Sequence, residues 1–416
     1  MSLNRRAGWL TAGGSLVVFV VLAALLVPWD PVPGGELQAA APLEVFTREQ
    51  IALAEEYATT RRYLGWASYA VSLVVAGILG FTSLGARLVK RVFGRRRWWL
   101  VVPGAVLLVL AIGRLATLPF SILVQRRNLE YGLTEQGWDA WAVDYGKSLL
   151  VAWVLTSLVL LVMVFAARRS PRMWFAWAGG FAAALTVAGS FLYPVVLEPV
   201  FNEFEPLGEG PLRTSVLQLA DEMDVAVDDV LVADASRRTT TLNAYVSGFG
   251  STRRVVLYDN LVNDLPPAEA RVVVAHELAH AKYQDVVVGT SLGAVGAVLG
   301  VALLALVLDS RRVRRRAHVA GPADPAAVPL VLALAAVAML LVSPVQSTIS
   351  RAIEVRADRE SLMETGESDT FVSMQRELAL ASLNDPTPPA WSHFWFGTHP
   401  TVLQRAGLPA SLAAAR

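Results

Sequence analysis

The 416-residue chain carries 36 basic and 35 acidic side chains, and it is 54% hydrophobic and 17% charged. Soluble proteins carry about a quarter charged residues, so this composition is that of a membrane protein with a water-facing part, and the net charge of +1 predicts no nucleic-acid partner. The absence of cysteine excludes disulfides, thiol nucleophiles and thiolate metal ligands, so any metal must bind to His, Asp or Glu.

Seven apolar stretches are long enough to cross a bilayer, which takes about 20 helical residues. They are 9–29, 63–86, 98–124, 148–167, 173–197, 286–308 and 328–349. The first is interpreted as a retained span, because its apolar run is too long for a signal peptide and ends without a small-residue cleavage site. Within the stretches only Arg114 is charged, which indicates either a polar interior among the helices or a local pair near a distorted helix. The fold class is therefore mainly α, a multi-pass membrane protein.

The longest soluble segment, residues 198–285, separates the fifth and sixth stretches and is predicted to form a small α+β region. Gly248 and Gly250 lie between two β-type runs, which is typical of a β-hairpin. The elements expected here are a helix at 211–223, a strand at 230–233, and a hairpin formed by 239–246 and 254–258.

A further helix is predicted to start after Asp264, where Pro266 and Pro267 precede a helical pattern. We expect this helix to continue directly into the sixth span, and the seventh span to continue as a helix to about Glu364. The chain is divided into a five-span transmembrane domain at 1–200 and a second region at 201–416, which includes spans 286–308 and 328–349.

His276, Glu277 and His280 form a His-Glu-x-x-His pattern on the predicted helix. Positions i and i+4 share a helix face, so both imidazoles can reach one tetrahedral zinc ion. The glutamate beside the first histidine can then take a proton from a zinc-bound water. The alternative is coincidence, which with only five histidines would occur on the order of a few times per thousand such chains. The motif therefore predicts a catalytic site with one zinc ion per chain.

A catalytic zinc needs a third protein ligand and keeps its fourth position for water. The candidates are Asp285, His318, His393, His399 and Glu354. Glu354 is favoured, because it and His280 are both expected within about 10 Å of the same membrane surface. His318 falls on the opposite side of the membrane, and Asp285 points off the ligand face. The alternative for Glu354 is an exposed helix carboxylate.

The motif His276-Glu277-x-x-His280, followed by Glu354-x-x-x-Asp358 after two more spans, resembles the CAAX prenyl protease type I family of zinc metalloendopeptidases. Other matching signatures are Pro199-x-Phe201-Asn202, Asn243-Ala244-Tyr245, and His399-Pro400 with Arg405. The resemblance covers nearly the whole chain, and the combination is highly specific. A bacterial member is expected, because only three of the 36 basic residues are lysine, as in proteins from GC-rich genomes.

The resemblance implies that His276, His280 and Glu354 bind zinc and that Glu277 is the general base. Asp358 would orient a ligand histidine; its alternative is a pairing along the helix surface. The resemblance also implies that the spans enclose a chamber with the zinc site at one end.

The resemblance assigns substrate contacts as well. Asn243 and Tyr245 belong to an edge on which an extended peptide would add as a strand, and the alternative is an ordinary hairpin. His399 and Arg405 would contact the scissile peptide, and His399 is expected to take part in catalysis by stabilising an oxyanion. The alternative for His399 is a structural loop histidine, and His393 is interpreted as structural.

The expected function is hydrolysis of peptide bonds in membrane-associated or lipid-modified polypeptides, either as CAAX-protease-like processing or as membrane protein quality control. Bacterial relatives are expected to degrade or trim membrane-associated polypeptides, since prenylated CAAX proteins are chiefly eukaryotic. Shorter heat-shock metalloproteases have fewer leading spans, and site-2-type proteases need an Asp-Gly pair that this sequence lacks. From a different class, the chain could be a catalytically inactive membrane receptor or transporter with a vestigial metal site.

Charge distribution predicts the orientation in the cell membrane. With the N-terminus in the cytoplasm, the short inside segments hold sixteen Lys and Arg residues and the short outside loops hold six. The positive-inside rule favours this arrangement, which places 198–285 and 350–416 outside. The zinc site is therefore expected on the extracytoplasmic side, whereas the eukaryotic family members expose theirs to the cytosol.

Overall fold

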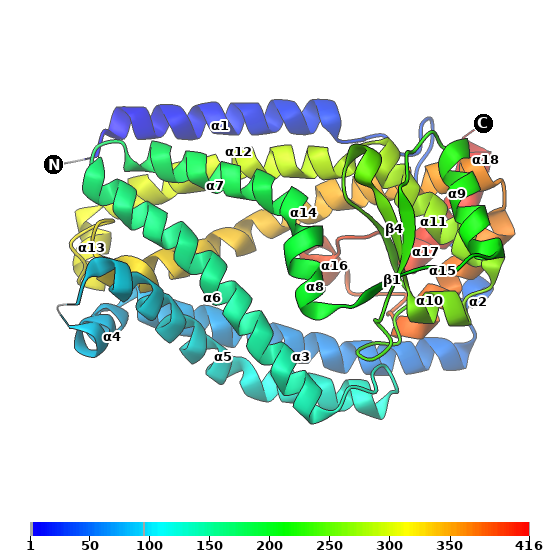
Figure 1. Ribbon diagram of the computed structural model, residues 1–416, viewed down its shortest axis with the longest axis horizontal. Helices are drawn as coiled ribbons and strands as arrows, with labels where there is room; N and C mark the ends of the chain where they lie inside the picture. The colour runs from blue at the N-terminus through cyan, green and yellow to red at the C-terminus, as the bar shows by residue number, and fades with distance from the viewer. Residues whose placement is uncertain (1–2, 95, 416) are drawn as a thin grey trace.

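The computed structural model describes residues 3–94 and 96–415, and long helices make up most of its length (Figure 1). Seven helical segments in these residues are long and apolar enough to cross a membrane. They are α1 (Arg5–Leu26), α3 (Arg48–Phe81), α5 (Trp98–Glu130), α6 (Trp138–Arg169), Trp174–Phe201, α12 (Asp285–Asp309) and Pro325–Thr365. The fifth begins with α7 (Trp174–Leu192), and the seventh contains α14 (Val328–Thr365). The prediction of seven spans is confirmed.

Six of these helices form a ring. Along it, α3 packs against α5, α5 against α6, α6 against α7 and α7 against α12, and α14 closes the ring by contacting both α12 and α3. The first span, α1, lies outside the ring on α12. In α3 and α5 burial is confined to the helix ends: no residue is buried between 58 and 78 of α3 or between 107 and 124 of α5. A ring packed at its ends and unfilled in its middle is chamber-like, as the family resemblance implied.

One end of the ring is closed by an apolar core. The first turns of α5, α7 and α14 meet the last turns of α6 and α12 there, and Val102, Trp174 and Leu330 are almost fully buried. Two short helices cover this end, α4 (Ser83–Phe93) and α13 (Arg311–Ala317). The five arginines at 311–316, which lie between the last two spans, are therefore on a helix that contacts the segment joining α3 to α5.

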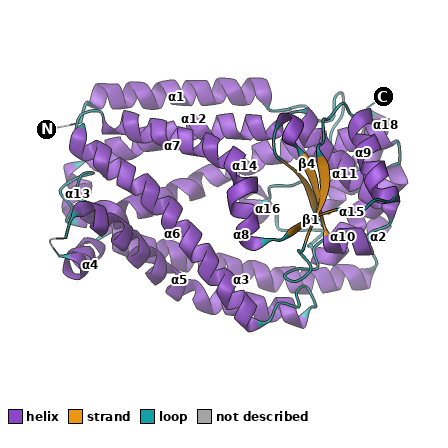
Figure 2. Ribbon diagram, viewed as in Figure 1, coloured by secondary structure: helices purple, strands orange, loops and turns teal. Residues whose placement is uncertain are grey.

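The other end carries the α+β region (Figure 2). Its sheet contains β1 (Phe204–Pro206), β2 (Asp229–Ala233), β3 (Ala244–Ser247) and β4 (Arg254–Tyr258) in the order β1-β2-β4-β3. The predicted hairpin is confirmed: β3 and β4 are antiparallel, with Val246 opposite Val255. Gly248 has a φ of +88°, and a Cβ there would lie 2.4 Å from the Thr252 carbonyl oxygen, so the turn requires glycine.

The first strand of the hairpin is shorter than predicted. The expected run 239–246 is a strand only from Ala244, because the side chain of Asn260 binds the preceding segment. Asn260 Nδ2 donates to the carbonyl oxygens of Thr239 and Thr241 at 3.1 and 2.9 Å. Those carbonyls are thus bound to a side chain and form no ladder with β4, so β3 is short. In the strand order β3 is an edge strand.

The helix that carries the two histidines, α11 (Pro267–Lys282), starts where the prolines predicted. The expectation that it continues without interruption into the sixth span is wrong. Gln284 adopts a left-handed conformation with φ 55°, so α11 ends and α12 begins at Asp285 in a new direction. The predicted continuation of the seventh span is confirmed, since α14 reaches Thr365.

Short helices complete the two ends. They are α2 (Pro42–Val45), α8 (Glu198–Phe201), α9 (Pro211–Glu222), α10 (Asp259–Asp264), α15 (Ser368–Ser382), α16 (Ala390–Phe396), α17 (Val402–Ala406) and α18 (Leu408–Ala414), with single turns at Tyr193–Leu197, Gly250–Thr252 and Pro325–Ala327. The second large core joins α9, α11 and α15 to the sheet, and Leu257, Val274 and Leu278 are fully buried in it. This core holds α11 rigidly between the sheet and α14.

Candidate metal centre

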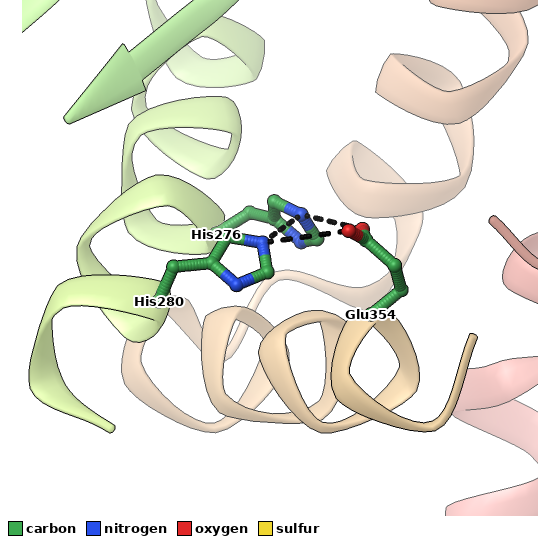
Figure 3. Close-up of side chains that lie close together, drawn as sticks. All are labelled: His276, His280 and Glu354. Atoms are coloured by element: carbon green, nitrogen blue, oxygen red, sulfur yellow. Dashed lines mark hydrogen bonds and ion pairs between the residues drawn. The ribbon is translucent and has the colours of Figure 1, made fainter. Parts of the chain in front are cut away.

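Three side chains from two helices converge at the ring end of the α+β region (Figure 3). His276 and His280 project from α11, and Glu354 projects toward them from α14. The two imidazole Nε2 atoms are 3.1 Å apart, and His276 Nε2 lies 3.2 Å from Glu354 Oε2. His280 Nε2 lies 3.8 Å from Glu354 Oε1. Residues 78 positions apart in the sequence thus present three donor atoms within 4.8 Å of one another.

Polar contacts between α11 and α14 set this register. Lys282 Nζ donates to Glu360 Oε1 at 2.5 Å, and the Tyr283 hydroxyl donates to Glu360 Oε2 at 2.9 Å. The next residue of α14, Ser361, donates its hydroxyl to the Val272 carbonyl oxygen at 2.9 Å. Because both helices are long and packed into the same core, these contacts fix where Glu354 meets the histidines.

The cluster fits a divalent metal ion. Glu354 Oε2 is buried and faces the histidines, yet it accepts no hydrogen bond from the described residues. Burial alone lowers the pKa of His276, but the carboxylates of Asp358 and Glu354 outweigh it and raise that pKa to about 10. The site therefore stabilises a positive charge between its donors, which is what a metal ion supplies.

Each histidine is oriented by its own carboxylate. Asp358, 1% exposed, places Oδ1 2.8 Å from His276 Nδ1. Asp285 places Oδ2 2.9 Å from His280 Nδ1. A carboxylate at Nδ1 fixes the ring and leaves Nε2 as the metal-facing atom. Asp285 was considered as a third ligand from the sequence, and the structure places it behind His280 instead.

Each of these aspartates in turn binds an arginine. Arg405 Nε donates to Asp358 Oδ2 at 2.8 Å, and Arg356 donates to the other oxygen of Asp285. Arg405 is largely buried in this contact and holds the carboxylate that orients His276. Its contact with substrate stays a prediction. No sequence pattern predicts the pair of Asp285 with Arg356, because this pair forms only where the chain turns at Gln284.

Glu277 and His399 flank the cluster. Burial raises the pKa of Glu277, the proposed base. His399 Nε2 lies 3.4 Å from Glu354 Oε2, while 57% of its side chain remains exposed, so the ring can still reach a bound molecule. The structure thus brings His399 to the metal cluster from a loop 45 residues beyond Glu354.

Hydrogen bonds from α14 hold the loop that carries His399. Arg351, one turn before Glu354, donates to the carbonyl oxygens of Gly397 at 2.6 Å and His393 at 3.2 Å. Ser343 donates to the Trp395 carbonyl oxygen at 2.7 Å. His393 Nε2 lies 2.9 Å from the carbonyl oxygen of His399. His393, interpreted as structural from the sequence, therefore supports the position of His399.

The predicted substrate-binding strand lies beside α11. β3 contacts α11 and has no strand partner on its outer side among the residues described. Asn243 is exposed just before the strand, and its carbonyl oxygen accepts from Tyr258 N at 3.0 Å. Tyr245 is half-buried, and its pKa is raised by burial and by the Glu198 carboxylate. The outer edge of β3 is thus positioned to pair with an extended chain.

Comparison with known proteins identifies the family. The model of peptidase family M48 matches residues 206–407. A second model, the CAAX prenyl protease N-terminal region with five membrane helices, matches residues 37–203. The chain belongs to peptidase family M48. It is a membrane metallopeptidase, and an inactive receptor or transporter is not favoured.

Relatives of this M48 peptidase include bacterial and eukaryotic proteins. The chain is 27% identical over 376 residues to the metalloprotease YhfN of Bacillus subtilis, covering 88% of this chain and 87% of that protein. It is 32% identical over 154 residues to CAAX prenyl protease 1 of Saccharomyces cerevisiae, covering 36% and 34% of the two chains. The crystal structure of S. mikatae Ste24p matches with a TM-score of 0.74 at 19% identity, over 96% of this chain and 98% of that chain. The two chains share their fold from end to end.

Proposed function

We propose that this M48 peptidase is a zinc-dependent endopeptidase in which His276, His280 and Glu354 bind one zinc ion. The observation that supports this proposal most strongly is that these three donors lie within 4.8 Å of one another, and that the buried Glu354 Oε2 among them makes no hydrogen bond to the described residues. Two imidazoles and one carboxylate are a known catalytic zinc ligand set that leaves a fourth position open.

Zinc held there would supply Lewis acidity and an acidified water. Glu277 acts as the general base that removes a proton from the attacking water, and its raised pKa lies nearer to the working pH than that of an exposed glutamate. His399 donates a hydrogen bond to the oxygen that gains charge as the peptide carbonyl is attacked. Asp358 and Asp285 hold the two imidazoles in place throughout.

The substrate is proposed to be a peptide segment of a membrane-associated or lipid-modified polypeptide. Its backbone would pair with the outer edge of β3, in the stretch from Asn243 to Val246, next to the helix that carries the metal ligands. The relative from Saccharomyces cerevisiae is named for prenylated substrates.

The zinc site is proposed to face the extracytoplasmic side of the cell membrane. The metal cluster lies at one end of the molecule, and the basic segments at 311–316 and before α5 lie at the other (Figure 1). One residue of the charge count, Arg95, lies outside the described residues. An excess of basic residues marks the cytoplasmic side.

Two substitutions test the chemistry. Glu277→Gln should keep one zinc ion per chain and lose peptide cleavage, because the ligands remain and the base is gone. Glu354→Ala should lose zinc as well, measured by metal analysis of the purified protein. Glu364→Gln, on the same helix and outside the cluster, is the matched control and should retain both. Full zinc content and activity in Glu354→Ala would remove Glu354 from the ligand set.

A further inference from the structure

The end of the molecule opposite the metal centre contains a basic cavity of about 620 Å³. Four cationic side chains line it: Lys90 of α4, Arg96 and Arg97 just before α5, and Arg168 at the end of α6. Val89 and Val101 add apolar surface to the same cavity. Nothing in the proteolytic mechanism uses these residues, so the cavity calls for an explanation of its own.

The described residues offset only part of the positive charge of this basic cavity. Among the described residues, no carboxylate forms an ion pair with any of the four cations. Lys90 and Arg168 donate to the carbonyl oxygens of His318 and Ala323, at 3.0 and 3.1 Å. These bonds hold two of the cations in place without reducing their charge.

One carboxylate, that of Asp324, also lines the cavity. Its two oxygens accept hydrogen bonds from the backbone N–H groups of Ala320 and Ala326, each at 3.0 Å. Asp324 therefore serves to cap the turn that begins α14. Its single charge leaves an excess of three positive charges around the cavity.

The cavity lies at the membrane boundary. Trp98 and Trp99, which line it, form the first turn of the span α5, and the guanidinium carbon of Arg168 lies 5.5 Å from the centre of the Trp98 ring. Tryptophan side chains gather at the headgroup level of bilayers, and Leu100 beside them is 46% exposed on the outer surface of the helix. The cavity thus combines unpaired cations with an adjacent apolar helix face.

We propose that this basic cavity binds the phosphate-bearing headgroup of an anionic phospholipid, whose acyl chains lie along the exposed face of α5. Arginine pairs with phosphate through two parallel hydrogen bonds, and basic pockets between membrane helices are sites for anionic headgroups. The positive-inside rule accounts for basic residues at this end of the molecule. It does not explain why four of them line one cavity together with two tryptophans. The proposal holds for either orientation of the chain and is independent of the proposed proteolysis.

The test measures the thermal unfolding midpoint of the delipidated full-length protein in detergent. Phosphatidylglycerol, phosphatidylcholine with the same acyl chains, and inorganic phosphate are added separately. A ligand that binds the folded state raises the midpoint, so phosphatidylglycerol should raise it and the other two should not. An equal rise with phosphatidylcholine, or with inorganic phosphate alone, would overturn the proposal.

Two triple variants remove the same charge from the same end of the molecule. Lys90→Gln with Arg96→Gln and Arg97→Gln empties the basic cavity of three cations, whereas Arg312→Gln with Arg315→Gln and Arg316→Gln changes exposed residues that do not line it. The first variant should lose the phosphatidylglycerol shift and the second should keep it. Both should retain the metal content of the unmodified protein, which checks folding. Equal losses in both variants would mean that diffuse charge, and not the cavity, attracts the lipid.

Discussion

At the residue scale, each histidine of the proposed metal centre is held by an aspartate that is itself bound by an arginine. His276 is held by Asp358 and Arg405, and His280 is held by Asp285 and Arg356. A buried carboxylate between an imidazole and a guanidinium has a partner on each side, which offsets part of its desolvation cost and fixes the ring. The geometry of the proposed ligands thus depends on residues outside the proposed ligand set.

Asp285→Asn should weaken zinc binding about 10- to 100-fold, the range found when a carboxylate behind a ligand histidine is removed. Cleavage should recover when zinc is added in excess, because Glu277 and all three ligands remain. Zinc affinity is measured by competition with a chelator. Asp309→Asn, at the far end of α12, is the control and should bind zinc normally. Unchanged affinity in Asp285→Asn would show that His280 is oriented without it.

Ionisation of Glu277 should determine how kcat/KM changes with pH on the acidic side. Burial raises its pKa, and the carboxylate must be ionised to accept a proton. The kcat/KM value should therefore rise with pH through a pKa above the usual range of an exposed glutamate, about 4.3. The residual activity of Glu277→Gln should lack this limb. If that variant shows the same rise of kcat/KM at the same pH, the rise reports the ionisation of another group.

At the element scale, two short segments present substrate contacts to the metal centre. The loop after α16 carries His399, and Arg351 of α14 binds the backbone on both sides of it. β3 presents its outer edge from the other direction. Both segments are too short to hold their positions alone, so each depends on a long helix or a neighbouring strand.

Arg351→Met should lower kcat while zinc content stays at one ion per chain, because the loop with His399 loses two hydrogen bonds to α14. Arg351→Lys should recover part of the rate, since an ammonium can still donate to one carbonyl. Steady-state kinetics and metal analysis provide the measurements. A normal kcat in Arg351→Met would show that the loop is held well enough by Ser343 and His393.

Val246→Pro should raise KM and leave zinc in place. Tyr258 N donates to the Asn243 carbonyl oxygen, and bonded pairs alternate along an antiparallel ladder, so the N–H of Val246 points away from β4. Proline there removes a donor from the free edge and none from the sheet. Val246→Ala keeps the donor and should bind peptide normally. If the proline variant has an unchanged KM, the peptide does not pair at this edge.

At the scale of the whole molecule, the proposed zinc site and the basic cavity lie at opposite ends of the membrane-spanning helices. Seven crossings place the N-terminus and the C-terminal region on opposite sides. Alkaline phosphatase fused to the C-terminus should be active, and a fluorescent protein that matures only in the cytoplasm should stay dark there. The same reporters fused after α4, in the loop before α5, should give the reverse pattern. Activity in the opposite positions would place the zinc site in the cytoplasm.

The sequence determined the features that depend on neighbouring residues. The seven spans follow from the length of apolar runs, and the placing of His276 and His280 on one helix face follows from their spacing of four. The hairpin follows from Gly248, which the turn requires because its φ is positive. The division at residue 200 stays a prediction, although the two family models meet at 203 and 206.

Only the tertiary structure decided how these elements meet. The turn at Gln284 rests on one residue in a left-handed conformation, which no periodicity signals, and it alone brings Asp285 to His280. Arg351 binds the backbone of His393 and Gly397, which lie 42 and 46 positions further along the chain, and Arg356 binds Asp285 across 71 positions. Contacts of this kind depend on how helices pack, and helix packing is set by cores assembled from the whole chain. The two histidines were therefore predicted from local pattern, and Glu354 and Asp358 from the family resemblance, while the contacts of Asp285, Arg356 and Arg351 could not be predicted before the helices were packed.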